Sequence, residues 1–410
     1  MNVDAARLTE QLETLARFSD APAPAVTRVV YTQADLDARA YLKTLIAEVG
    51  LSVREDALGN LFARWEGQGS TLAAVATGSH IDAIPFSGRF DGTVGVLGGL
   101  EAIRALKTSG FRPRRSLELI LFTAEEPTRF GVGCFGSRAL AGVLTPDALA
   151  ALKGEDGLSV LEAARQAEFV GDANKVKLEP GHYHAFAELH IEQGPRLEAA
   201  GVPIGVVSAI AAPATLHVTL TGAGGHAGAV LMRDRRDALT SGAEIALAVE
   251  AAALTTGTPD SVATVGVFDV HPRAVNSIPG RVFLTVDVRD TDLARRDGMV
   301  TRIQEDIEAI SQKRGIEVVV EVLNADPPAT CAPDIIEAAH AAAAGEGLAA
   351  KTLVSRAYHD TLFMARVCPV GMIFIPSQNG YSHRPDEYSS PEEITQGVRV
   401  LARTLAALAE

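Results

Sequence analysis

The sequence predicts an α/β protein whose catalytic domain, a mostly parallel sheet flanked by helices, is interrupted by a smaller inserted domain. The chain has 410 residues, more than a single core usually accommodates. Apolar runs alternate with helical patterns up to about residue 210 and again from about residue 327, as in parallel sheets covered on both faces. Between these parts the predicted order is βαββαβ, the ferredoxin-like or split βαβ arrangement.

The first part of the chain supplies most elements of the expected sheet and its helices. Apolar residues with a helical period indicate helices, and short apolar runs bounded by turn residues indicate strands. A further apolar run, AFAELHIEQGP, reads as a strand that ends in polar groups. By these criteria we expect helices at 4–18, 33–49 and 92–109, and strands at 60–65, 72–77 and 116–123.

The inserted domain is expected at residues 212–326, which leaves 1–211 and 327–410 for the catalytic domain. Alternating apolar residues predict its strands, and two long amphipathic stretches predict its helices. In chain order these are strand 214–221, helix 233–254, strands 261–270 and 281–289, helix 293–313 and strand 316–323. The catalytic domain then resumes with helix 334–346, strand 371–376 and a final helix from Pro391.

Composition and charge exclude several classes of function. A net charge of −14 and the lack of a basic stripe argue against nucleic acid as a partner. No apolar stretch approaches the roughly 18 residues that span a membrane, and the acidic N-terminus does not resemble a signal peptide. Three separated cysteines, Cys134, Cys331 and Cys368, suit a reducing compartment better than a disulfide framework. We therefore expect a cytoplasmic enzyme.

Two adjacent acids, Glu125 and Glu126, follow the apolar run LELILFTA. Ionised carboxylates at the end of a buried strand are costly unless a cation receives them. His80, Asp82 and Asp91 lie in GSHIDAIPFSGRFDG, which also follows an apolar run. These five residues look like the first half of a metal site, in which one acid binds metal and the other transfers protons.

The spacing within GSHIDA favours a metal ligand with a supporting carboxylate. Side chains at i and i+2 of a strand end share a face, so Asp82 can accept the second ring N–H of His80 and fix its tautomer. A surface turn with incidental polar residues explains this pair about as well. For Asp91, which precedes a helix, a simple N-cap is by itself the more common explanation.

The full set of histidines and carboxylates at strand ends favours metal ligands over these simpler explanations. His190 and Glu192 end the run AFAELHIEQGP, and His383 lies in a loop after the apolar run GMIFIP. Chance places one such residue easily, but three histidines and several carboxylates, each beyond a separate apolar strand, form an inventory of metal ligands.

At this point the chain resembles a known family. The strings GSHIDAIP, GRFDGTVGVLGGLEAI, FTAEEPTRFG, LHIEQGPRLE, GGHAGAVLMRDRRDAL, NSIPG, VDVRD and GYSHRPDE are similar to those of the dinuclear-zinc amidohydrolases that include N-carbamoyl-L-amino-acid and allantoate amidohydrolases. This group belongs to the wider zinc aminoacylase and carboxypeptidase superfamily. The resemblance runs from about residue 5 to the C-terminus. It implies that the inserted domain is a lid and dimerisation module, and hence that the protein is a homodimer.

The resemblance also implies a role for each matched residue of the metal site. Glu125 would be the general base, and Asp82 would support His80. The cofactors would be two divalent metal ions, with zinc expected and manganese, cobalt or nickel as alternatives. One ion would be held by His80 and His190 and the other by Glu126 and His383, with Asp91 bridging both.

Four further residues would meet the substrate. His226, in GGHAG, resembles the histidine that stabilises the developing oxyanion in the partner's active site. Arg289 resembles the anchor of the substrate carboxylate, a task suited to a guanidinium fork. Asn276 and Gln193 resemble amides that contact the ureido or carboxylate group. Without the resemblance, a histidine in a Gly-rich turn, a strand-end charge and two loop-capping amides would explain these residues.

The chain departs from the family pattern in segments that surround the substrate. SRAYHDT places Arg356 and Tyr358 where many relatives have glycine, although His359 is retained. HAGAVLM lacks the Thr-Thr-Pro that often follows the histidine, and EEPTRFG replaces the commoner EEGSRF. The metal ligands are unaffected, so these changes put the identity of the substrate in doubt.

The function implied is metal-dependent hydrolysis of a non-peptide C–N bond in a small N-carbamoyl or ureido acid, such as an N-carbamoyl-L-amino acid or an allantoate-like compound. Metal-activated water would attack, with a glutamate as base. An N-acyl amino acid hydrolase or dipeptidase using the same metal pair is the alternative. A non-catalytic binding protein is disfavoured because Glu125 and all five implied ligands are retained.

Overall fold

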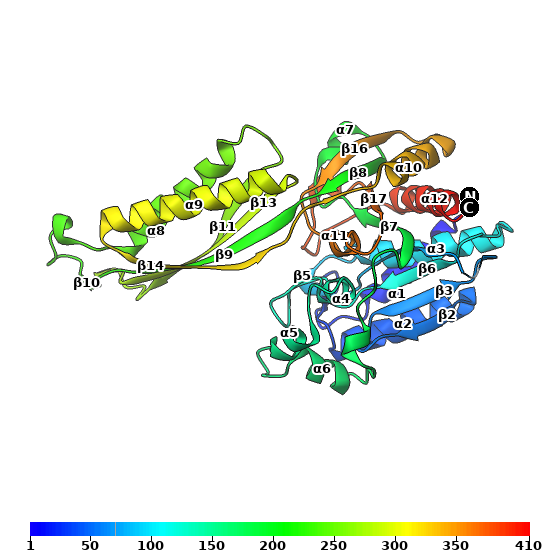
Figure 1. Ribbon diagram of the computed structural model, residues 1–410, viewed down its shortest axis with the longest axis horizontal. Coiled ribbons are helices and arrows are strands. Elements are labelled where there is room, and N and C mark those ends of the chain that lie inside the picture. Colours follow the sequence, from blue (N-terminus) through cyan, green and yellow to red (C-terminus); the bar gives the residue numbers. More distant parts are fainter. Residues whose placement is uncertain (70) are drawn as a thin grey trace. The chain divides into compact units, whose positions relative to one another are not determined.

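The structure, a computed structural model, describes residues 1–69 and 71–410 and divides into two compact units (Figure 1). Both junctions lie close to the domain boundaries expected from the sequence. The segment Arg356–Tyr358, however, belongs to the inserted unit, whereas we expected it in the catalytic domain. The large unit comprises Met1–Ser208, Thr330–Ser355 and His359–Glu410, and the inserted unit comprises Ala209–Ala329 and Arg356–Tyr358.

The large unit is built on a mixed sheet whose centre is parallel. Its strand order is β15-β8-β17-β7-β4-β6-β3-β2, with β16 paired to β8. The four central strands, β17, β7, β4 and β6, run parallel, whereas β8, β3 and β2 pair antiparallel toward the edges. The strands are β2 (Ser52–Glu55), β3 (Leu61–Trp65), β4 (Ala74–Ser79), β6 (Leu117–Leu121), β7 (Tyr183–Ile191), β8 (Ile204–Ile210), β15 (Ala329–Thr330), β16 (Ala350–Ser355) and β17 (Val370–Ile375).

Both faces of this sheet are covered, because its central strands are apolar on both sides. In β6, Leu119 and Leu121 join one buried core with residues of α3 and α12, whereas Ile120 joins a second core with residues of α4 and α6. The helices are α1 (Ala5–Ala16), α2 (Gln33–Val49), α3 (Thr93–Thr108), α4 (Phe135–Leu140), α5 (Pro146–Ala151), α6 (Val160–Gln166), α7 (Arg196–Ala200), α10 (Pro333–Gly345), α11 (Asp360–Met364) and α12 (Pro391–Leu408), beside a separate ribbon of β1 (Val26–Arg28) and β5 (Ala83–Ser87).

The inserted unit has one four-stranded antiparallel sheet, of order β11-β13-β9-β14, and two long helices. Alternate residues of β9, namely Leu216, Val218 and Leu220, are buried in a core shared with α8 and α9. In chain order the elements are β9 (Ala212–Thr221), β10 (Gly225–His226), α8 (Ala238–Leu254), β11 (Val262–His271), β12 (Ser277–Ile278), β13 (Arg281–Asp290), α9 (Leu293–Arg314) and β14 (Glu317–Ala325).

One helix of this unit begins later than expected. The sequence pattern predicts a helix from residue 233, but α8 starts at Ala238 because Asp237 caps it, accepting the backbone N–H groups of Leu239 and Thr240. Residues Met232–Asp234 form a short 3-10 turn instead.

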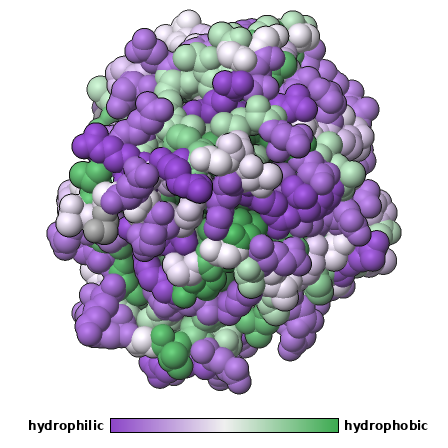
Figure 2. Space-filling view, turned by 90° about the vertical axis from the view of Figure 1, so that its right-hand side faces the viewer, coloured by the Kyte–Doolittle hydropathy of each residue, from purple (hydrophilic) through white to green (hydrophobic). Residues whose placement is uncertain are grey.

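One face of the molecule is mainly hydrophilic, with small hydrophobic areas between the polar residues (Figure 2). Among the helices of residues 1–69 and 71–410, none combines the length and the apolar character needed to cross a membrane.

Candidate active site

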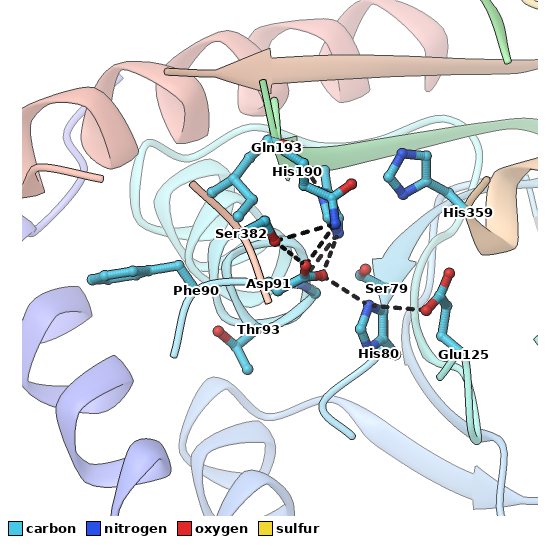
Figure 3. Close-up of polar contacts among 12 residues, drawn as sticks. Ser79, His80, Phe90, Asp91, Thr93, Glu125, His190, Gln193, His359 and Ser382 are labelled. Carbon is cyan, nitrogen blue, oxygen red and sulfur yellow. Dashed lines mark hydrogen bonds and ion pairs between the residues drawn. The ribbon is translucent and has the colours of Figure 1, made fainter. Parts of the chain in front are cut away.

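The carboxyl ends of the four parallel strands meet at one edge of the sheet, where open α/β sheets bind their ligands. His80 follows β4, Glu125 and Glu126 follow β6, and His190 is the penultimate residue of β7. His383 lies in the loop after β17. Because β17 pairs with β7, and β7 and β6 both pair with β4, these residues are brought together from four separate segments. Figure 3 shows His80, Glu125 and His190 of this set beside Asp91.

Asp91 lies at the centre of this cluster and presents one carboxylate oxygen to each of two groups. Its Oδ1 is 3.4 Å from Nε2 of His80 and 3.2 Å from Nε2 of His190. Its Oδ2 is 3.4 Å from Nε2 of His383, which is itself 3.3 Å from Oε1 of Glu126. Each group offers three donor atoms that lie within 4.8 Å of one another. Two sets of three nitrogen and oxygen donors sharing one carboxylate suit a pair of divalent cations.

The histidine ring nitrogens are arranged as metal ligands require. Nδ1 of His80 lies 3.1 Å from the backbone oxygen of Asp82, and Nδ1 of His190 lies 2.9 Å from that of Ile191. A proton on each Nδ1 leaves Nε2 as the nitrogen with a lone pair, and Nε2 of His190 accepts the N–H of Gly92 at 3.1 Å. Both Nε2 atoms face Asp91.

Asp82 has a wider role than the sequence suggested. We expected its carboxylate to accept the ring N–H of His80, but that contact is 3.6 Å, and the backbone oxygen of Asp82 is closer. The carboxylate instead accepts the backbone N–H groups of Glu125 at 3.2 Å and Glu126 at 3.0 Å. It therefore holds the glutamate pair, directly after Ala124, whose φ of 54° turns the chain.

Glu125 stands beside the donor groups rather than within either of them. Its Oε2 is 3.8 Å from Nε2 of His80, and its Oε1 accepts the thiol hydrogen of Cys134 with a sulfur–oxygen distance of 3.5 Å. Burial, reinforced by the charge of Glu125, raises the pKa of Cys134 well above its ordinary value. Cys134 is therefore a packed neutral thiol, and it donates a hydrogen bond to the candidate base.

Buried acids give this site an excess of negative charge. Burial, together with Asp91, raises the pKa of Glu126 to about 7, and burial raises the pKa of Glu125 well above its ordinary value. The hydrogen bond with Asp91 and the charge of Glu126 raise the pKa of His383 to about 9. The pKa of His80 is raised although burial, the largest single effect, opposes this, because the charge of Glu125 and the contacts with Asp82 and Asp91 together outweigh the burial. Acids and histidines that both retain protons indicate a site that lacks positive charge, which divalent cations would supply.

A second layer of buried acids supports the site and was not predicted. Glu188, in the middle of β7, accepts hydrogen bonds from the hydroxyls of Ser79, at 2.7 Å, and Thr361. Asp360 accepts the hydroxyl of Ser137 at 2.5 Å, and burial followed by the charge of Glu188 raises the pKa of Asp360 to about 8. The available signal was Glu188 itself, a charged residue in an apolar strand, two residues before His190 and so on the same strand face.

Three residues expected at the site have contacts that were not anticipated. Glu192 caps α7 by accepting the backbone N–H groups of Arg196 and Leu197, so it is no longer a candidate ligand. Gln193 donates from Nε2 to Oδ2 of Asp91 at 2.6 Å. His359 is buried, with its ring 4.5 Å from that of His190 and its Nε2 3.0 Å from the hydroxyl of Ser355.

In the inserted unit, the structure brings Arg289, Arg356 and Tyr358 together. Arg289 donates from Nε to Asp287 at 2.7 Å and from Nη1 to the backbone oxygen of Arg356 at 3.1 Å. The side chain of Arg356 pairs with Asp260 at 2.6 Å, and the ring centroid of Tyr358 is 5.9 Å from Cζ of Arg289. The two bulky residues of SRAYHDT thus flank the arginine that the resemblance assigns to the substrate carboxylate.

His226 and Asn276 are also neighbours in the inserted unit. His226 ends β10, which pairs with β12, and the N–H of Ala227 donates to the backbone oxygen of Asn276 at 2.9 Å. Both side chains are exposed. Nδ1 of His226 accepts the N–H of Gly228 at 3.1 Å, so its Nε2 is the ring nitrogen that carries the proton in the neutral tautomer.

The chain is similar to several known proteins. The model of peptidase family M20/M25/M40 matches residues 76–407. A ureidoglycolate hydrolase of Arabidopsis thaliana is 54% identical over 417 residues, covering 100% of this chain and 87% of that protein. An N-carbamoyl-L-amino acid amidohydrolase of Geobacillus stearothermophilus is 38% identical, covering 98% of each chain. The crystal structure of AtUAH in complex with (S)-hydroxyglycine superposes with a TM-score of 0.91 at 53% identity, covering 100% of this chain and 98% of that one.

Proposed function

This chain belongs to peptidase family M20/M25/M40, and we propose that it hydrolyses a non-peptide carbon–nitrogen bond in a small ureido acid, using a pair of divalent cations. It is an amidohydrolase, in line with its similarity over full length to ureidoglycolate and N-carbamoyl-L-amino acid hydrolases. The observation that carries the proposal is that two groups of donor atoms share Asp91. A further carboxylate, Glu125, lies beside these groups and belongs to neither of them.

His80, His190 and Asp91 would hold one cation, and Glu126, His383 and Asp91 the other. Zinc fits these nitrogen and oxygen donors, as do manganese, cobalt and nickel. When bound, the cations supply Lewis acidity to the scissile carbonyl and to the attacking water.

The proposed base is Glu125, because it is the carboxylate at the site that neither donor group needs. It takes the proton of the attacking water and returns it to the leaving nitrogen. Two contacts keep the residue in place: the backbone N–H of Glu125 is held by Asp82, and Oε1 accepts the thiol of Cys134. Burial of Glu125 keeps bulk water away from the proton.

Several residues that follow the family pattern would contact the substrate. Arg289, oriented by Asp287, would meet the substrate carboxylate, and the exposed imidazole of His226 would stabilise the developing oxyanion. Asn276 and Gln193 would contact the ureido or carboxylate group, and His359 would also contact the substrate. The bulk of Arg356 and Tyr358 beside Arg289 favours a compact acid over one with a large side chain. A ureidoglycolate-like compound, which carries a hydroxyl there, fits this restriction.

A panel of substrates tests this proposal through the release of ammonia. We expect kcat/KM for ureidoglycolate to exceed that for N-carbamoyl-L-amino acids with large side chains by roughly 10–200-fold, the range that pocket size alone provides. Allantoate, N-acetyl amino acids and dipeptides complete the panel. Turnover of acyl compounds alone, without ammonia, would instead identify an N-acyl amino acid hydrolase or dipeptidase.

We also propose that the protein is a homodimer assembled through the inserted unit. Its edge strand β11 exposes Val267 and Phe268, and α8, which packs beside β11, exposes Leu247 and Leu254. Large apolar side chains grouped at a sheet edge are typical of a surface that a second protein covers.

The three cysteines are free, which is compatible with a cytoplasmic location.

Light scattering at micromolar concentration is expected to give the mass of a dimer for the unaltered chain and of a monomer for the double variant Leu247→Glu/Leu254→Glu. The two introduced glutamates would prevent dimerisation, because their charges would have to be desolvated in the interface. If the partner contributes His226 to the active site, the monomeric variant also loses activity. A fully active monomer of the unaltered chain would contradict the proposal.

A further inference from the structure

Glu387 is a buried carboxylate that touches the backbone of Asp91. Its Oε1 accepts two backbone N–H groups, from Phe90 at 2.8 Å and from Asp91 at 3.1 Å. Its Oε2 lies 3.0 Å from Oγ of Ser382. The residue is only 3% exposed, and it lies 297 residues beyond Phe90 in the chain. One side chain thus ties together the two loops that carry Asp91 and His383.

Ser382 extends this connection to the carboxylate of Asp91. Its Oγ lies 2.7 Å from Oδ2 of Asp91 (Figure 3). The same Oδ2 is 3.4 Å from Nε2 of His383. Glu387 therefore acts on Asp91 in two ways: directly through the backbone N–H, and through Ser382 at the carboxylate. These contacts determine where each oxygen of Asp91 points.

Gly88 shows how closely the two loops approach. A Cβ atom at this position would lie 2.4 Å from Cβ, Cδ and Oε1 of Glu387. Any side chain at residue 88 would displace the carboxylate, so Gly88 offers a second way to disturb the same contact from the opposite loop.

A carboxylate that accepts two backbone N–H groups forms charge-assisted hydrogen bonds, which are short and directional. Burying that charge is costly, and a neutral packed side chain would stabilise the loops at less expense. The contacts of Glu387 are instead with the backbone of Phe90 and Asp91 and with Ser382, which itself touches the carboxylate of Asp91, the residue that both donor groups share. This distribution fits a role in geometry better than a role in general stability.

We propose that Glu387 is a positioning residue of the cation centre, which holds the bridging carboxylate of Asp91 and the loop bearing His383 in one geometry. This inference rests on the proposed function, because it assumes that cations bind between these residues. It predicts that the loss of Glu387 weakens cation binding even when no substrate is present.

Titration of chelator-treated protein with Zn²⁺, followed by calorimetry or by competition with a chromophoric chelator, tests the inference. Glu387→Ala is expected to weaken Zn²⁺ binding by about 10–100-fold, as is typical when a partner of a metal ligand is removed. Gly88→Ala should have an effect in the same direction. Glu387→Gln should stay within about threefold of the unaltered chain, because an amide oxygen can accept the same N–H groups.

Glu101→Ala is the matched control. Glu101 is also buried, at 1% exposure, and accepts a backbone N–H, from Asp4, but it lies on α3 and pairs with Arg7. Its replacement should lower the unfolding temperature and leave Zn²⁺ binding unchanged.

The outcomes separate this inference from the proposed function. Failure of the unaltered chain to bind Zn²⁺ overturns both. Unchanged binding by Glu387→Ala, or an equal loss in Glu387→Gln and Glu387→Ala, overturns the positioning role alone. If Glu387→Ala does not fold, as judged by circular dichroism, Gly88→Ala decides by the same titration.

Discussion

Replacement of Glu125 by glutamine is expected to reduce kcat by about 10²–10⁴-fold, the range that a positioned acid–base group contributes. The amide has the shape of the carboxylate but cannot take a proton from water. The backbone contact with Asp82 and the room beside Cys134 are unchanged, so the variant should fold. Initial rates of ammonia release at saturating substrate measure kcat.

The metal content of this variant distinguishes a base from a ligand. Glu125 belongs to neither group of donor atoms, so Glu125→Gln should keep both cations in elemental analysis. Glu126→Gln is the control, since Glu126 is a member of one group and its loss should remove a cation together with activity. Full activity in Glu125→Gln would refute the assignment of the base.

Replacement of Asp91 by alanine is expected to remove both cations and all measurable turnover. Both groups of donors include Asp91, and without it each retains only two protein ligands. The loss of affinity should exceed the roughly 10–100-fold that follows from losing an outer partner of a ligand. Elemental analysis after gel filtration and the Zn²⁺ titration described above measure this loss.

His383→Ala provides the comparison for this prediction. His383 belongs to one group only, so this variant should lose one cation and keep the other. Equal metal content in Asp91→Ala and His383→Ala would show that the carboxylate is not shared. Asp91→Asn, which keeps one oxygen, should fall between them.

The apolar periodicity of the sequence was sufficient to locate most of the large unit's central strands and the elements of the inserted unit. β6 illustrates why: Leu119 and Ile120 face different cores, so a continuous apolar run correctly indicated a strand covered on both sides. Strand ends then located the candidate site, since parallel strands present their carboxyl ends at the same edge. His80, Glu125 and His190 are close in space for that reason.

Spacing along the chain could not show which distant backbone groups an acid would meet. Glu192 lies between two other polar residues of HIEQG, His190 and Gln193, and looked like a ligand, but its carboxylate caps α7. Asp82 and Glu387 accept N–H groups of residues 43 and 297 positions away, respectively. Such contacts depend on the path of two loops in space. Glu387 lies four residues after His383 in GYSHRPDE. This spacing alone does not reveal its role, because its N–H partners lie in a distant loop.

The order of strands has a consequence for how the protein is made. β17, from Val370 to Ile375, lies between β8 and β7, which were synthesised much earlier. During synthesis, β7 and β8 are made before β17, the strand that pairs with both of them. Until β17 is present, the facing edges of β7 and β8 are unpaired, and unpaired strand edges can pair with other chains. His383 and Glu387 emerge later still. A nascent chain therefore lacks part of the proposed set of cation ligands until its last segment has been made.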